Sequence, residues 1–132
     1  MGEDNMPELP VTSITAAIAA IMLVALGMFT GMQRVRSKVL LGTSDDDILL
    51  RRVRAHGNFT EYVPIALIVL MLTEAGGADA MLLWTMAGLL IAGRILHAVG
   101  ILGVILPARS IGMMMTLVSI LIGAVALLTG NV

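Results

Sequence analysis

The chain has 132 residues, of which 58% are hydrophobic and 13% are charged, and its formal net charge is −1. Average soluble domains carry roughly 25% charged residues, so this composition indicates a single-domain membrane protein. The near-zero net charge gives no reason to expect a nucleic-acid partner. The sequence contains no cysteine, which excludes disulfides, thiolate metal ligands and a cysteine nucleophile.

Four segments contain the roughly 20 mostly apolar residues that a membrane-crossing helix needs. We predict spans at 11–32, 53–72, 80–102 and 111–128, within helices of about 11–33, 47–74, 79–104 and 108–130. One side chain of the Ser-Asp-Asp-Asp run at 44–47 is expected to cap the second helix, and Pro107 is expected to mark a helix break. The sequence therefore predicts an all-α integral membrane protein whose single domain, residues 1–132, is a four-helix bundle.

Charged residues outside the spans are distributed unevenly. The first and third connections carry the basic residues Arg34, Arg36, Lys38, Arg51, Arg52 and Arg109. The N-terminal segment and the second connection carry the acidic residues Glu3, Asp4, Glu8, Glu74 and Asp79, without Lys or Arg. Because basic loops stay in the cytoplasm, we expect the first and third connections there and both termini outside.

Polar residues form a stripe where the second span begins. On a helix, an arc of about 100° contains Arg51, Arg54, Asn58, Glu61, Tyr62 and Ile65. His56 points about 160° away from Arg54 on the same projection, so it cannot line the same side of this helix. A site that uses both His56 and Arg54 must therefore lie between subunits.

The third span repeats the pattern, because Arg94 and His97 lie one turn apart on one face. Ionisable groups at such depth cost at least ~2.5 kcal/mol each unless they are paired or hydrated. One interpretation is a structural network in which Glu61 pairs with Arg94 or Arg54, with neutral histidines hydrogen-bonded inside the bundle. The excess of cations favours instead a pocket for an anionic ligand, open to the cytoplasm and the bilayer. Two histidines without a third ligand predict no metal site.

The segment RRVRAHGNFTEYVP, residues 51–64, resembles the Arg-x-x-Arg-Ala-x-x-Asn-x-x-Glu-x-x-Pro element of the MAPEG family, the membrane-associated proteins in eicosanoid and glutathione metabolism. GRILHAV and LPARS are similar to the Gly-Arg-x-x-His and Ala-Pro-x-Arg-Ser segments of the prostaglandin E synthases in that family, and GMQRVRSK matches the basic end of the first helix. The similarity is greatest to the short bacterial branch, which implies a bacterial inner membrane protein.

The resemblance implies a left-handed four-helix bundle that assembles as a homotrimer, with glutathione bound at the cytoplasmic side of each subunit interface. Arg109 would stabilise the glutathione thiolate, with Ser110 beside it. The other residues that it assigns to glutathione binding are Arg54, Asn58, Glu61 and Tyr62 from one subunit, Arg34 and His56 from its neighbour, and Arg94 and His97 in the third helix. Ile101 stands where many of the family's transferases carry tyrosine, and Gly57 where the prostaglandin synthases carry arginine.

The implied function is glutathione transfer to a lipophilic electrophile taken from the bilayer, with glutathione-dependent reduction of lipid hydroperoxides as a further activity. Two alternatives are a non-catalytic lipid-binding or lipid-presenting protein, which the family also contains, and a small structural membrane protein. A lipid-presenting protein has no need of a cation at the sulfur position, so Arg109 favours the enzyme.

Overall fold

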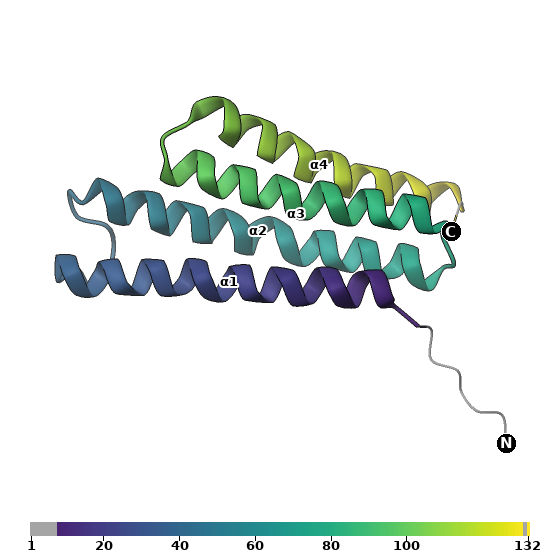
Figure 1. The fold of residues 1–132 in the computed structure, drawn as a ribbon, viewed down its shortest axis with the longest axis horizontal. Helices are drawn as coiled ribbons and strands as arrows, with labels where there is room; N and C mark the ends of the chain where they lie inside the picture. The colour runs from purple at the N-terminus through teal and green to yellow at the C-terminus, as the bar shows by residue number, and fades with distance from the viewer. Residues whose placement is uncertain (1–7, 131) are drawn as a thin grey trace, which may run out of the picture.

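The computed structural model describes residues 8–130 and 132, so Glu3 and Asp4 of the acidic N-terminal segment lie outside the described residues. The described part of the chain folds into four helices, α1 (Pro10–Ser37), α2 (Asp47–Ala75), α3 (Ala80–Leu102) and α4 (Leu106–Thr129) (Figure 1). Each helix is long and apolar enough to cross a membrane. The prediction of an all-α chain with four membrane-spanning helices is confirmed.

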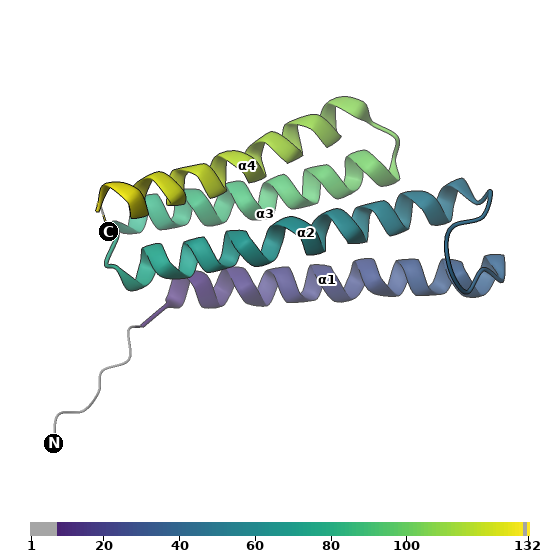
Figure 2. The ribbon, with the colours of Figure 1, turned by 180° about the vertical axis from the view of Figure 1, so that it is seen from behind.

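Successive helices run in opposite directions and lie side by side, with α2 and α3 between α1 and α4 (Figures 1 and 2). The loop between α1 and α2 and the turn between α3 and α4 lie at the same end of the bundle, which we call the basic end because it carries Arg34, Arg36, Lys38, Arg51 and Arg109. At the basic end α1 and α2, with 28 and 29 residues, reach further than α3 and α4, with 23 and 24.

Asp46 is the residue of the predicted run that caps α2. Its Oδ1 accepts hydrogen bonds from the backbone N–H groups of Ile48, at 2.9 Å, and Leu49, at 3.0 Å. Its Oδ2 accepts a hydrogen bond of 2.9 Å from Gln33 Nε2 on α1. This bond, together with the capping bonds, lowers the pKa of Asp46 from 3.8 to about 2. The cap therefore also ties α2 to α1.

Three helix bounds at the basic end differ by two or more residues from those predicted, and one of them is the end of α3, at Leu102 rather than 104. α1 continues to Ser37 and ends where Lys38 adopts a left-handed conformation. α4 begins at Leu106, so that Pro107 lies within its first turn rather than before it. Proline fits the first turn because the N–H groups there have no partner within the helix.

Glu74 lies within α2, one residue before its end. It is buried, and its two carboxylate oxygens accept hydrogen bonds from the free N–H groups at the start of α1. Oε1 lies 2.8 Å from Val11 N and Oε2 lies 2.7 Å from Thr12 N. A carboxylate is favoured at the positive end of a helix, so Glu74 fastens α1 to α2 at the end opposite the basic end.

Helices α3 and α4 approach so closely that their backbones touch. A Cβ atom added to Gly100 on α3 would overlap the backbone of Arg109, and one added to Gly112 on α4 would overlap the backbone of His97. Small residues allow such contact in membranes, where no hydrophobic effect drives helices together. Arg109 is therefore held beside Gly100 by the crossing itself.

Candidate functional site

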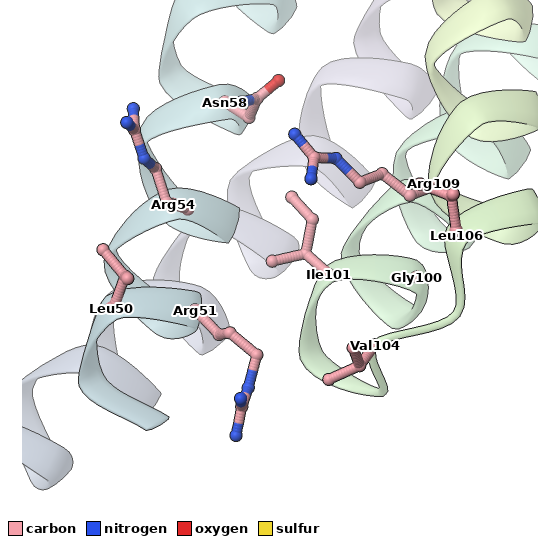
Figure 3. A pocket seen from close by; sticks show the side chains of 9 residues that line it. All are labelled: Leu50, Arg51, Arg54, Asn58, Gly100, Ile101, Val104, Leu106 and Arg109. Atoms are coloured by element: carbon pink, nitrogen blue, oxygen red, sulfur yellow. The ribbon is translucent and has the colours of Figure 1, made fainter. Parts of the chain in front are cut away.

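A pocket of about 550 Å³ opens at the basic end between α2, α3 and the start of α4 (Figure 3). This volume lies within the range of roughly 300–1,000 Å³ that is typical of small-molecule sites. The pocket is lined by Leu50, Arg51, Arg54, Asn58, Gly100, Ile101, Val104, Leu106 and Arg109.

Helix α2 contributes Arg51, Arg54 and Asn58, which share one face because they are three and four residues apart. These residues are the first part of the polar stripe predicted from the sequence. Arg51 belongs to that stripe, and the structure places it in the pocket lining although the family resemblance gives it no role in glutathione binding. The next members of the stripe, Glu61 and Tyr62, do not line the pocket.

Arg109 lies in the first turn of α4, and its side chain extends across the pocket toward Asn58 on α2 (Figure 3). The guanidinium groups of Arg51, Arg54 and Arg109 make no hydrogen bond or ion pair with any other described residue. No acidic side chain lines this pocket. Because guanidinium groups bind carboxylates through paired hydrogen bonds, three unpaired ones around one pocket suit an anionic ligand.

Arg94 has a different environment from the one that the sequence suggested. Its side chain is only 2% exposed, and Nε donates a hydrogen bond of 2.8 Å to Thr116 Oγ1 on α4. Nη1 lies 3.4 Å from the carbonyl oxygen of Asn58, and the guanidinium lies 5.7 Å from the centre of the Tyr62 ring. Arg94 therefore joins α2, α3 and α4 beside the pocket rather than lining it, and the pairing with Glu61 is not found among the described residues.

His97 supports Arg109 through the backbone. Its Nδ1 lies 2.8 Å from the carbonyl oxygen of Arg109. A carbonyl oxygen only accepts hydrogen bonds, so Nδ1 is the donor and carries a proton. Nε2 is buried without a hydrogen-bond partner among the described residues. His97 thus holds the first turn of α4 and does not line the pocket.

The remaining candidate residues lie outside this pocket within one chain. Arg34 Nη1 donates to the carbonyl oxygen of Gly42 at 2.8 Å and lies 3.4 Å from that of Leu40, so Arg34 orders its own loop. The ring of His56 faces Gly27 on α1, on the other side of α2 from Arg54. Glu61 and Ser110 are exposed on α2 and α4. The cross-subunit roles of Arg34 and His56 remain predictions.

The remaining lining residues are apolar. Leu50 lies on α2 beside the arginines, and Ile101, Val104 and Leu106 lie at the turn between α3 and α4 (Figure 3). The position that is tyrosine in many of the family's transferases therefore presents a hydrocarbon side chain, Ile101, and the α3–α4 side of the pocket is apolar apart from Arg109.

The described residues thus form a helical integral membrane protein, a bundle of four membrane-spanning helices with a cation-lined pocket at one end. The sequence model of the MAPEG family matches residues 12–129. This chain is a multi-pass membrane protein that belongs to the MAPEG family. It is also similar to the inner membrane protein YecN of Escherichia coli strain K12 and of E. coli O6:H1 strain CFT073. Each is 29% identical over 90 residues, which cover 68% of this chain and 69% of the relative.

Proposed function

We propose that this protein is a membrane-bound glutathione S-transferase that conjugates glutathione to a lipophilic electrophile. The observation that carries the proposal is that Arg51, Arg54 and Arg109 line one pocket without a neutralising partner among the described residues. Glutathione is a tripeptide with two carboxylates and a thiol, so it offers the negative charges that this pocket lacks. Membership of a family that includes glutathione transferases supports the proposal.

The donor set suits this ligand. Arg51, Arg54 and Asn58 lie along one face of α2 and would hold the two carboxylates and the peptide backbone. Arg109 reaches the pocket from a different helix, so it would approach a separate part of the ligand, the sulfur. The geometry supports this division of roles, in which one face of α2 would bind the ligand and Arg109 on α4 would supply the cation for the chemistry.

Arg109 would act by stabilising negative charge on sulfur. A thiol has a pKa of about 8.5, and only its thiolate form is a strong nucleophile. A fixed guanidinium beside the sulfur lowers that pKa, and each unit corresponds to about 1.36 kcal/mol. When bound, glutathione would lose its thiol proton to water, and its sulfur would form a carbon–sulfur bond to the electrophile while the leaving group departs with the bonding electron pair. His97 would keep Arg109 in place through its carbonyl oxygen.

The proposal includes a homotrimer with the site at subunit interfaces. Glu61 is the fifteenth of the 29 residues of α2, and it is exposed with no partner among the described residues of its own chain. An ionised carboxylate that faces lipid at that depth costs at least ~2.5 kcal/mol. A neighbouring subunit that covers this face of α2 would remove the cost and bring Glu61 to the shared site. The number of subunits, three, comes from the family resemblance.

We place the protein in a bacterial inner membrane with the pocket facing the cytoplasm and the termini outside. The name of the E. coli relative supports the first part. The distribution of charge supports the second, because Arg36, Lys38 and the three pocket arginines all lie at the basic end.

The test adds glutathione to the purified protein in detergent near neutral pH. Calorimetry measures binding, and the short-wavelength absorbance measures the thiolate that forms. The protein has no cysteine, so any thiolate signal belongs to glutathione. We expect Arg54→Ala to weaken binding at least tenfold and Arg109→Ala to abolish the thiolate signal. Arg36→Ala, which removes an exposed charge outside the pocket, is the matched control and should change neither.

Each other result has a definite meaning. Binding without thiolate absorbance in the wild type would refute the transferase and favour a lipid-binding or lipid-presenting protein. Absence of binding would refute the glutathione site. Light scattering on the same detergent complex should give the mass of three chains, and the mass of a single chain would refute the trimer.

A further inference from the structure

Val104, in the turn between α3 and α4, adopts a backbone conformation that is unfavourable for its side chain. Its φ angle is +58°, in the left-handed region that β-branched residues rarely enter. The other non-glycine residues with positive φ in the described part of the chain are Lys38 and Ser44, neither of which is β-branched. Gly103, the neighbouring residue that would tolerate this conformation, has φ −89°.

The backbone of the turn gives no reason for valine at this position. The turn is closed by hydrogen bonds from Gly103 N to the carbonyl oxygen of Val99 and from Ile105 N to that of Gly100, both 2.8 Å long. A glycine at 104 would make the same turn without steric conflict. Packing within the chain gives no reason either, because the Val104 side chain is 72% exposed.

The pocket does offer a reason, since Val104 lines it. Ile101 lies one turn earlier on α3, and its side chain lies between Arg109 and the turn that carries Val104 (Figure 3). Leu106 completes the apolar group at the start of α4. An apolar surface therefore begins beside the Arg109 guanidinium and continues to the mouth of the pocket at Val104.

We propose that Val104 is a specificity-determining residue, which with Ile101 and Leu106 forms the binding wall for the apolar second reactant. The inference rests on the proposed function, because it places the electrophile on the opposite side of the sulfur from the α2 cations. The wall offers no polar side chain, so it selects uncharged electrophiles whose reactive carbon carries an alkyl or aryl group. The conjugate with its hydrocarbon group would lie on the same wall.

The experiment measures the affinity that a hydrocarbon group adds, and it needs no turnover. S-methylglutathione and S-hexylglutathione are titrated by calorimetry into the full-length wild type, Val104→Gly and the control Ser44→Gly, all in one detergent. Ser44→Gly relieves the same kind of backbone conformation, at φ +48°, outside the pocket. We expect the wild type to bind the hexyl compound at least about tenfold more tightly than the methyl compound. Val104→Gly should lose most of this difference and keep its affinity for S-methylglutathione, whereas Ser44→Gly should keep both.

Thermal unfolding of the same proteins adds an independent readout. Both glycine variants should unfold at a temperature equal to or above that of the wild type, because each removes an unfavourable conformation. A lower unfolding temperature for Val104→Gly alone would show that the side chain serves the fold and would overturn the inference. An unchanged preference for the hexyl compound in Val104→Gly would also overturn it, while leaving the glutathione site intact. Absence of binding of either compound to the wild type would refute the proposed function and this inference together.

Discussion

Gly100→Ala tests whether the contact between α3 and α4 positions Arg109. A Cβ atom at Gly100 would lie 2.6 Å from Arg109 Cα and 2.8 Å from Arg109 Cβ. Ordinary carbon–carbon contacts are about 3.5–4.0 Å, so α4 must move away by about 1 Å. Overpacking of this kind costs about 1–3 kcal/mol. A displacement of about 1 Å in a positioned group can lower a rate about 100-fold, so we expect Gly100→Ala to lose most of the thiolate signal.

The matched control is Gly88→Ala on the same helix, where an added Cβ meets no atom within 4 Å. Alanine favours a helix over glycine by up to about 1 kcal/mol, so this variant should unfold at the same temperature as the wild type or above it. The assay combines unfolding in detergent with thiolate absorbance at saturating glutathione. A Gly100→Ala protein that matches Gly88→Ala in both measurements would refute the argument that backbone contact sets the position of Arg109.

Two further predictions concern the ends of the helices. Glu74→Gln should destabilise the protein by about 1.5–3 kcal/mol, because one of the two α1 N–H groups then faces an amide NH₂. Glu8→Gln is the exposed control. Equal unfolding free energies for the two variants would contradict the argument that Glu74 fastens α1 to α2. Asp46→Asn should lower the unfolding temperature by an amount that is constant above about pH 4. Because the folded pKa of Asp46 is about 2 and its ordinary value is 3.8, the advantage of the carboxylate should disappear as the pH falls from about 4 to 2. If the difference in unfolding temperature between the wild type and Asp46→Asn is as large at about pH 2 as above pH 4, the lowered pKa of Asp46 is contradicted. Asp45→Asn is the control.

The number and approximate extent of the membrane-spanning helices could be predicted from the amino-acid sequence. This was possible because the length of an apolar run and the 3.6-residue period are local properties. For the same reason, helical spacing alone predicts that Arg51, Arg54 and Asn58 share one face of α2. The sequence shows only that the capping residue of α2 is one of residues 44–47. Which of them caps the helix depends on a contact with another helix, the hydrogen bond from Gln33 to Asp46.

Which residues from different helices lie close together depends on how the helices pack. Arg109 joins the α2 cations because Gly100 and Gly112 let α3 and α4 touch, and no local pattern reveals where two helices cross. Arg94 shares its sequence character with the pocket arginines, yet it turns toward Thr116 and the interior. The left-handed conformation of Val104 likewise depends on how the turn closes onto Gly100. Membrane helices are individually stable, so their sequences determine them one by one, whereas the site exists only where their packing brings side chains together.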